Sequence, residues 1–407
     1  MPPIACHRSV GEMQGFRAEH RNAFTLSEWA GAVGDLGILL PFAFALVIFN
    51  EFPPERLLFL WGLTYIVTGW YYRVPVSVQP LKAMAVIAIA AGFGVPELAS
   101  TAIFFGTLMI ILSVTGVIGI LQRFFSISLI RGIQMGLGFI LFQTSVTMIT
   151  GRGLILGTED VNLLLNLLLT LFTVLFIVII QKKLKLPAGL IVIMLSVVIA
   201  YSYGAQTMSY MSYKGLIDPT LPRLGFLGTA LVVLMIPQLP LTLGNAVYAA
   251  SDACCTFWPD RSERATPARL GLSIGLSNIA IGLSGGFPIC HGAGGIAAHA
   301  RFGGTTGGTT MILGVILLVA ALIRPLSDLL FAIPIPVLGA LLILTSWKLI
   351  VLVRDLKRTL EIITASAVGL LSFITRNITI ALVAGFLIER GLLLAHDRFN
   401  LFRGEEA

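Results

Sequence analysis

The sequence predicts an all-α polytopic membrane protein with fourteen transmembrane segments, arranged as seven-plus-seven inverted repeats. Three observations support this fold class: an apolar composition, apolar runs that recur along the whole chain, and two interrupted segments at matching places in the two halves. Hydrophobic residues make up 57% of the chain and charged residues only 12%, whereas soluble globular domains carry about 25% charged residues. The composition therefore excludes a soluble enzyme and predicts the lipid bilayer as a partner.

The formal net charge of +7 raises the question of a nucleic-acid partner. No basic cluster sits beside aromatic residues that would stack on bases, so no nucleic-acid binding is expected. In a protein with many crossings, an excess of Lys and Arg belongs in cytoplasmic loops. If both termini are cytoplasmic, most Lys and Arg fall inside, among them Arg261, Arg264, Arg269, Lys348 and Arg354. We therefore expect a multi-pass protein of the cell (inner) membrane.

Apolar runs of about 17 to 25 residues recur between charged or Pro/Gly-rich breaks, and each is long enough to cross a bilayer as a helix. These runs lie at 27–50, 55–72, 97–121, 129–150, 160–181, 187–203, 226–250, 267–285, 305–324, 328–347, 360–375 and 376–396. Two irregular pieces, at about 75–92 and 288–302, complete the fourteen segments. Leaving out either piece would scramble the uneven distribution of Lys and Arg between the two sides, which supports counting both as crossings.

The two irregular pieces lie in stretches that repeat. "GLTYIVTGWYYRVPVSVQPLKAMAVIA" (62–88) aligns with "GLSNIAIGLSGGFPICHGAGGIAAHAR" (275–301), so that Gly62 falls on Gly275. In each half a short extended piece with Pro interrupts a span, and a small-residue helix follows it. Because seven is an odd number of crossings, the two halves must be inverted relative to each other. Paired interrupted segments of this kind point to the substrate site of a transporter.

Lys82 stands at the start of the helix that follows Pro80, a favourable first-turn residue. That helix start and a second one near Gly292, arriving from the opposite side, each present about half a positive charge. With the Lys82 ammonium these sum to about +2, which matches a dianion. The alternative is a lysine whose amine reaches the membrane interface, although a lysine at the bilayer centre costs about 2.5–3.5 kcal/mol on insertion scales.

The run Gly292–Gly295 consists of small residues at the second helix start. Such residues let oxyanion oxygens approach main-chain N–H groups closely, although close packing between helices also favours them. Gln79 and His291 are expected to donate further hydrogen bonds. The candidate substrate-binding residues are Gln79, Pro80, Lys82, His291, Gly292, Ala293, Gly294, Gly295 and Gln238.

Asp35 is the only acid deep within the first span. Acids inside membrane segments are functional candidates, and three roles stay open: carrying a coupling proton, pairing with Lys82, or capping a local break in the helix. Its counterpart in the second half is Gln238, between Pro237 and Pro240, which predicts a polar but uncharged lining residue in a kinked helix.

The segments "PVSVQPLKAMAVIAIA" and "FPICHGAGGIAAHARFGGTTGG" closely resemble the two signature segments of the molybdate transporter family, within the sulfate permease superfamily. The resemblance implies uptake of the oxyanion molybdate by alternating access, with tungstate competing. It also implies a site between segments 3 and 10, each a short strand plus a half-helix. By motif match it assigns substrate binding to Gln79, Lys82, His291, Gly292, Gly294 and Gly295.

The same resemblance implies a division into a moving core domain and a gate domain. The expected parts are a cytoplasmic tail (1–24), core (25–121), gate (122–225), core (226–324), gate (325–397) and a second cytoplasmic tail (398–407). Homodimers are common in the superfamily, and a proton or sodium ion is a possible coupling partner. No metal and no cofactor are expected.

Other functions remain as alternatives. The charge argument does not separate molybdate from sulfate, so a sulfate permease stays open, and an anion channel would also focus ions with half-helices. A nucleobase permease is disfavoured because the positions that hold acids in those proteins carry Gln238 and the Cys290–His291 stretch. An enzyme with Cys290 as nucleophile and His291 as base is not expected, because adjacent residues at a helix start point in different directions.

Overall fold

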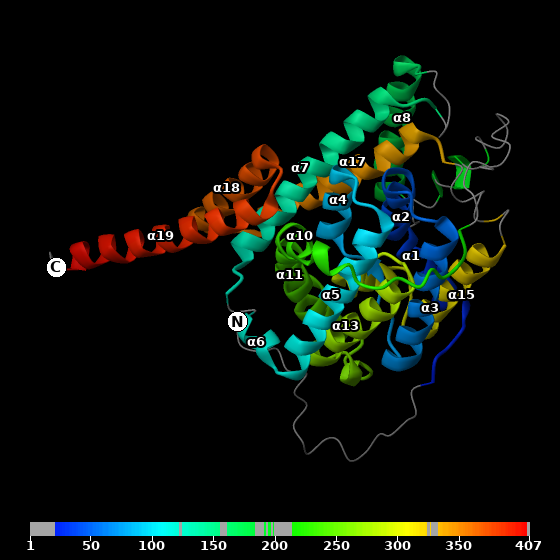
Figure 1. Cartoon of the computed structure of the whole chain (residues 1–407), viewed down its shortest axis with the longest axis horizontal. Coiled ribbons are helices and arrows are strands. Elements are labelled where there is room, and N and C mark those ends of the chain that lie inside the picture. Colours follow the sequence, from blue (N-terminus) through cyan, green and yellow to red (C-terminus); the bar gives the residue numbers. More distant parts are fainter. Residues whose placement is uncertain are drawn as a thin grey trace, which may run out of the picture.

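The computed structural model describes residues 21–121, 124–154, 161–183, 191–192, 194–196, 198, 214–323, 326 and 333–404. These residues form a mostly helical molecule with two very short strands (Figure 1). The elements of the first half are α1 (Leu26–Gly34), α2 (Leu36–Asn50), α3 (Pro54–Tyr72), β1 (Gln79–Pro80), α4 (Lys82–Ala91), α5 (Val95–Val114), α6 (Val117–Leu121), α7 (Ile127–Gly151) and α8 (Leu163–Lys183).

The second half begins with one continuous helical path over Leu224–Phe257. It comprises η2 (Leu224–Phe226), α10 (Leu227–Thr229), η3 (Ala230–Met235), α11 (Ile236–Leu241), η4 (Thr242–Tyr248) and α12 (Ala249–Phe257). After it come η5 (Ser262–Arg264), α13 (Pro267–Leu283), β2 (Ile289–Cys290), α14 (Ala293–Arg301), α15 (Gly308–Leu322), α17 (Ile335–Val351), η6 (Leu352–Asp355), α18 (Thr359–Thr375) and α19 (Ile378–Gly404).

Most predicted spans coincide with helices, and the differences have local causes. The run predicted at 27–50 is broken at Asp35 into α1 and α2, which are bent by 42°. Gly34 and Gly37 flank the break, and Pro41 has no N–H to donate to the carbonyl of Gly37, so this turn is weakly held. The run at 97–121 is divided into α5 and α6.

Two expectations fall wholly or largely outside the described residues. These are the N-terminal tail up to residue 20 and most of the span at 187–203. At the other end of the chain α19 continues as helix to Gly404, beyond residue 397, where the last domain was expected to end.

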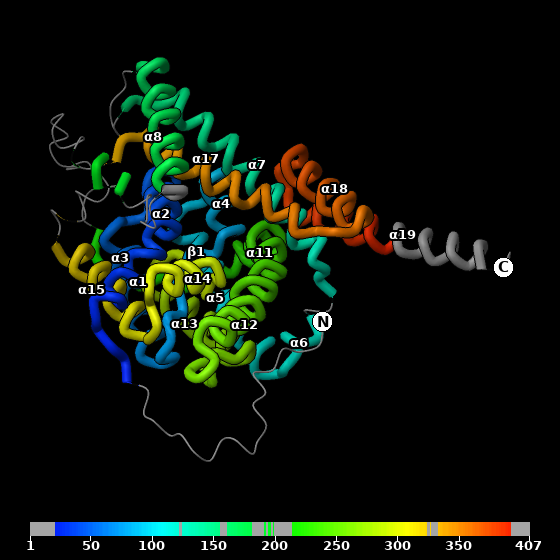
Figure 2. The backbone as a smooth tube through the Cα atoms, turned by 180° about the vertical axis from the view of Figure 1, so that it is seen from behind, coloured from blue at the N-terminus to red at the C-terminus, as the bar shows by residue number. Residues whose placement is uncertain are grey.

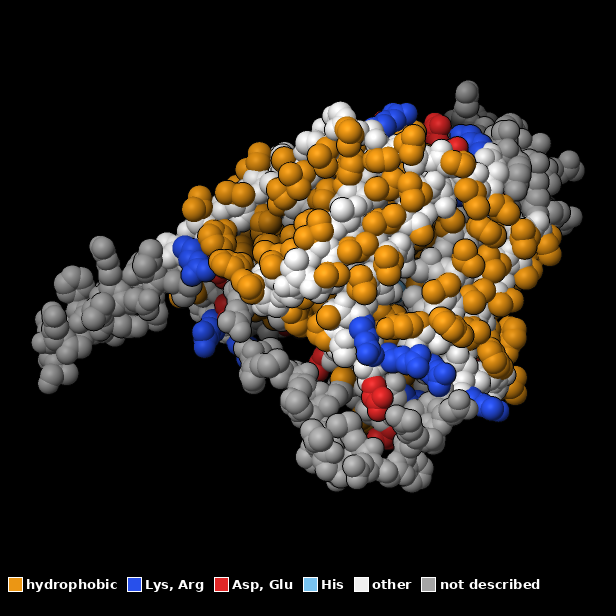
Figure 3. All heavy atoms as spheres, turned by 60° about the horizontal axis from the view of Figure 1, so that its bottom comes forward, with side chains coloured by type: hydrophobic (Ala, Val, Ile, Leu, Met, Phe, Trp, Pro, Cys, Tyr) orange, Lys and Arg blue, Asp and Glu red, His pale blue; other side chains and the backbone are white. Residues whose placement is uncertain are grey.

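Five helices in the described part of the chain are long and apolar enough to cross a membrane, or six if the bent pair α1–α2 is one span. Shorter apolar helices include α4, α15 and α18. One face of the molecule is covered largely by hydrophobic side chains, with Lys and Arg toward its edges (Figure 3). Helix α8 exposes large apolar side chains such as Leu164 and Phe172, as expected for a lipid-facing helix.

The helices pack in two sets. In the first, α15 lies against α3, α13 against α5, and α1 and α12 against α14. In the second, α17 and α18 lie against α7, and α8 and α19 pack beside them. Figures 1 and 2 both show the second set running together along one side of the molecule. Helix α2 contacts members of both sets, and α4 lies against α7, α2 and α11.

Close helix contacts through glycine recur in the two halves. A Cβ atom on Gly62 would lie 2.8 Å from the carbonyl oxygen of Gly314 in α15. One on Gly275 would lie 2.9 Å from the carbonyl oxygen of Gly106 in α5. Both glycines therefore allow two backbones to approach more closely than any other residue would permit.

Candidate site between two interrupted segments

The two interrupted segments meet as a two-stranded antiparallel sheet, with Gln79 opposite Cys290 and Pro80 opposite Ile289. Leu81 donates its backbone N–H to the carbonyl of Pro288 at 3.1 Å. These bonds satisfy extended backbone inside the protein, which is a requirement at membrane depth. Because the strands are antiparallel, α4 and α14, which follow them in the chain, leave the sheet at opposite ends.

A helix residue holds the second strand in place. Asn278 of α13 accepts the N–H of Ile289 at 2.7 Å and donates to the carbonyl of the same residue at 2.9 Å. The amide thus acts as a further strand partner for β2. Trp61 of α3 donates its indole N–H to the carbonyl of Phe287 at 3.2 Å, so both neighbouring helices fix this segment.

Gln238 caps the start of α4. Its Oε1 accepts the backbone N–H groups of Ala83 at 2.8 Å and Met84 at 3.2 Å, and its Nε2 donates to Thr242 at 3.0 Å. The predicted lining residue is therefore buried, and both ends of its amide form hydrogen bonds within the protein. It takes two of the N–H groups that the first helix start was expected to offer to an anion.

The start of α14 is open instead. Gly294 is exposed, and a Cβ atom built on it would meet nothing within 4 Å. Among the described residues, none accepts a hydrogen bond from the N–H groups of Ala293 or Gly294. Two free donors thus face open space at the positive end of a helix.

Lys82, the first residue of α4, is half-buried. Within the described part of the chain, no carboxylate forms an ion pair with it. Lys348 of α17 lies within electrostatic range of both Lys82 and Arg301. Positive charges from both helix sets therefore gather where no acid neutralises Lys82, an arrangement that favours an anion.

Asp35 lies at the α1–α2 break and is wholly buried. Its Oδ2 accepts the hydroxyl of Tyr65 at 2.5 Å and its Oδ1 accepts Nε2 of Gln79 at 2.5 Å. His299 Nε2 lies 3.7 Å from the same Oδ2. The side chain makes no capping hydrogen bond to either helix, and its partners do not include Lys82.

Gly295 allows this cluster to lie against α14. A Cβ atom at Gly295 would approach within 2.5 Å of Gln79 Nε2, 2.5 Å of Ser77 and 2.7 Å of Asp35 Oδ1. No other residue fits there without displacing the Gln79–Asp35 hydrogen bond. Gly295 thus allows close packing, whereas Gly294 leaves the N–H groups at the start of α14 accessible.

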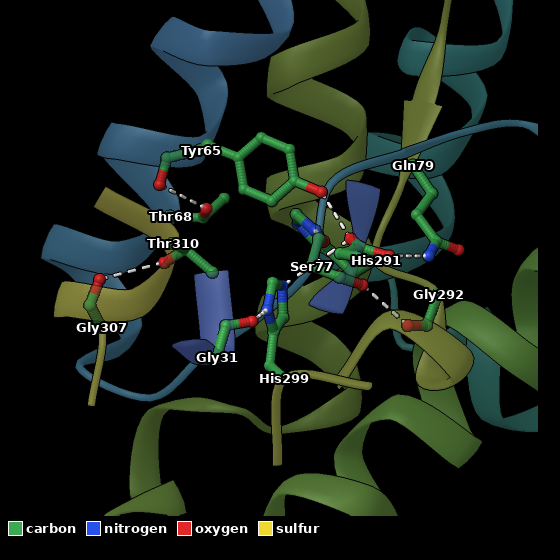
Figure 4. A network of polar contacts seen from close by, with 11 residues as sticks. Gly31, Tyr65, Thr68, Ser77, Gln79, His291, Gly292, His299, Gly307 and Thr310 are labelled. Atoms are coloured by element: carbon green, nitrogen blue, oxygen red, sulfur yellow. Dashed lines mark hydrogen bonds and ion pairs between the residues drawn. The ribbon is translucent and has the colours of Figure 1, made fainter. Parts of the chain in front are cut away.

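His291 is a wholly buried linker between the segments. Its Nδ1 lies 2.9 Å from the carbonyl oxygen of Ser77, so Nδ1 must donate, and its Nε2 accepts from the hydroxyl of Ser273 at 2.9 Å. Ser77 in turn donates to the carbonyl of Gly292 at 2.7 Å (Figure 4). Both ring nitrogens are therefore occupied, and His291 has no free donor for a substrate in this conformation.

The structure brings the candidate residues together around the strand pair but divides them by role. Lys82, Ala293 and Gly294 present charge or free donors, whereas Gln79, His291, Gly295 and Gln238 hold the scaffold. Sequence reasoning did not single out Tyr65, Ser77, Ser273 or Asn278. Hydroxyl and amide residues are common in such spans, so only their place in the fold marks them.

A family model described as a molybdate transporter of the MFS superfamily matches residues 27–141 and 230–349. These two regions contain both interrupted segments. "Molybdate transporter 1" of Arabidopsis thaliana is 31% identical over 378 residues, covering 81% of this chain and 80% of the relative. "Molybdate transporter 1" of Chlamydomonas reinhardtii is 25% identical, covering 84% of this chain and 88% of the relative.

Solved structures with the same fold are anion transporters by their titles. The transmembrane domain of a cyanobacterial bicarbonate transporter, BicA, is 19% identical, with a TM-score of 0.67 over 88% of this chain and 97% of that chain. Murine Slc26a9, an anion transporter in the inward-facing state, is 15% identical, with a TM-score of 0.67 over 92% of this chain and 69% of that chain. At such identities the likeness shows the fold alone.

Proposed function

Because the chain belongs to the molybdate transporter family, we propose that it takes up molybdate across the cell membrane, with both termini cytoplasmic and with tungstate as a competitor. The observation that carries this proposal concerns the described residues: Lys82 has no carboxylate partner there, and the N–H groups of Ala293 and Gly294, across the strand pair, have no acceptor. A tetrahedral dianion bound there would accept hydrogen bonds from both and would face the Lys82 ammonium.

We propose alternating access as the mechanism, with the first helix set as the core domain and the second as the gate domain. Helix α3 packs against α15, and α13 packs against α5. In the predicted repeat α13 corresponds to α3 and α15 corresponds to α5, so the same contact occurs once from each half. This packing supports the seven-plus-seven inverted repeat. The glycine contacts at Gly62 and Gly275 support the same symmetry. A homodimer is a further expectation.

The site lies where the two sets approach each other. Helix α4 contacts α7, and Lys348 of α17 brings a second cation from the gate set. Sliding one set against the other would change which side of the membrane reaches the open N–H groups, while the strand pair carries the site as one unit.

The test is binding of molybdate, tungstate and sulfate to the purified protein, with Lys82→Met as the principal variant. Lys357→Met is the matched control, because Lys357 is exposed in the loop before α18. We expect molybdate and tungstate to compete and Lys82→Met to lose at least tenfold in affinity, about 1.4 kcal/mol. The control should bind as the parent does.

Three results would change the assignment. Equal or tighter sulfate binding would indicate a sulfate permease. Flux into liposomes that does not saturate with molybdate would indicate a channel. Unchanged affinity in Lys82→Met would show that this lysine does not meet the substrate.

A further inference from the structure

The imidazole of His299 is buried, and one of its ring nitrogens faces a carboxylate oxygen with no hydrogen bond between them. Its Nδ1 lies 2.9 Å from the carbonyl oxygen of Gly31, and since a carbonyl only accepts, Nδ1 carries the hydrogen. In a neutral ring Nε2 then has a lone pair and no hydrogen. Nε2 lies 3.7 Å from Oδ2 of Asp35 and has no hydrogen-bond partner among the described residues.

Two acceptors thus face each other in a place without exposure to solvent, since Asp35 and His299 are both 0% exposed. A buried acceptor without a donor destabilises the folded protein, because it has lost its hydrogen bonds to water. A proton on Nε2 converts that nitrogen into a donor aimed at the carboxylate and removes the conflict. We propose that Asp35 and His299 together form a proton-binding site, occupied in step with the oxyanion; this rests on the proposed function.

The pair reaches the substrate region through Gln79. Asp35 Oδ1 holds Nε2 of Gln79, and Gln79 Oε1 is buried without a partner among the described residues. That oxygen lies at the start of α14, where a Cβ on Gly292 would collide with it. In this state Gln79 therefore turns an acceptor, not a donor, toward an incoming oxyanion.

A proton on the pair reverses this preference. When the proton resides on Oδ1 of Asp35, that oxygen becomes a donor and bonds to Oε1 of Gln79 instead of its Nε2. The amide can then rotate and point its NH₂ group toward the oxyanion. Compensation also removes the repulsion between a buried carboxylate and a dianion, which is large at low dielectric.

The other charged or titratable groups around Asp35 and His299 do not supply the missing hydrogen bond. Tyr65 already donates to Asp35, and Glu28 of α1 accepts from Thr305, Thr306 and Thr309. The neighbouring elements also carry charged or titratable groups: Glu55, Arg56, Tyr71 and Tyr72 on α3, Lys82 on α4, Asp252, Cys254 and Cys255 on α12, Cys290 and His291 at β2, Arg301 on α14 and Lys348 on α17. Within the described part of the chain, none of them forms a hydrogen bond to His299 Nε2.

A sodium ion fits the same place less well. Sodium binds oxygen ligands, whereas an imidazole nitrogen suits protons and transition metals. One of the two facing atoms is such a nitrogen. The geometry therefore favours a proton over sodium as the ion coupled to the oxyanion.

The experiment measures proton uptake on molybdate binding by titration calorimetry in buffers of different ionisation enthalpy near neutral pH. The observed enthalpy varies linearly with the buffer's ionisation enthalpy, and the slope counts the protons taken up. Asp35→Asn and His299→Asn are the variants. Asn at position 299 can still donate to Gly31, and Asn at position 35 can still accept from Tyr65. The control is Asp252→Asn, an exposed acid on α12.

We expect proton uptake in the parent and in the control, and a slope near zero in both variants while molybdate still binds. Binding without proton uptake in the parent would overturn the proton site, whatever the variants do. Retained uptake in both variants would also overturn it. In liposomes, accumulation driven by a sodium gradient at equal pH would do the same. Absence of molybdate binding in the parent would instead refute the proposed function.

Discussion

Oε1 of Gln238 accepts the backbone N–H of Ala83 at 2.8 Å, so a side chain from the helical path of the second half caps the half-helix of the first. The corresponding position in the first half, Asp35, lies against α14 near Gly295. Each interrupted segment is thus supported by a polar residue from a kinked helix. Asp35 is an acid and Gln238 is a neutral amide, and of the two only Gln238 accepts hydrogen bonds from helix N–H groups.

Two replacements of Gln238 distinguish its role as the cap of α4 from its effect on the charge near the anion site. Gln238→Leu leaves two buried N–H groups without an acceptor and should lower stability by about 1 kcal/mol, as for loss of other N-terminal caps. Gln238→Glu keeps the acceptor, which favours the helix dipole, but adds negative charge beside the anion site. We expect it to melt near the parent temperature and to bind molybdate at least tenfold more weakly. Equal affinity in Gln238→Glu would place the anion away from α4.

Gly294 and Gly295 should respond differently to the same substitution. A Cβ at Gly295 lies within 2.7 Å of three side chains, so Gly295→Ala should cost about 1–3 kcal/mol and lower the melting temperature. Gly294→Ala meets open space, so the protein should fold normally but bind molybdate more weakly, because the methyl group occupies the approach to the free N–H groups. Thermal melting and binding together check this. Unchanged affinity in a well-folded Gly294→Ala would contradict access from this side.

Glu28 joins α1 to the turn before α15. Its carboxylate accepts from Thr305 N–H at 3.2 Å, the Thr305 hydroxyl at 2.6 Å and Thr306 N–H at 3.1 Å, and the Thr309 hydroxyl also contacts it. Glu28→Ala should therefore lose about 1–3 kcal/mol for each donor left buried. We expect a clearly lower melting temperature with molybdate affinity retained in the folded fraction. Glu263→Ala, which replaces an exposed acid in the short helix η5, should melt as the parent does.

The paired glycine contacts should be equally sensitive in the two halves. Gly62→Ala and Gly275→Ala each place a methyl group within 2.9 Å of a backbone oxygen on the neighbouring helix. Both should destabilise the protein by about 1–3 kcal/mol. Gly37→Ala is the control, since a Cβ there meets nothing within 4 Å and Ala favours helix. Loss of stability in only one of the two variants would argue against equivalent roles.

The positions of the helices and of both interrupted segments follow from the sequence, because hydrophobic run length and Pro/Gly breaks are local properties. The start of α4 at Lys82 and the small residues at the start of α14 follow from the same local signals. The fourteen-segment count stays a prediction, since the described residues omit most of one span and several helices are shorter than a full crossing.

The roles within the site depended on tertiary structure. Gln79 was expected to meet the substrate but donates to Asp35, and His291 is held by Ser77 and Ser273. A hydrogen bond depends on distance and direction between residues far apart in the chain, and no spacing rule encodes either. His299 and Asp35 are 264 positions apart, and only packing of α1 against α14 brings them face to face.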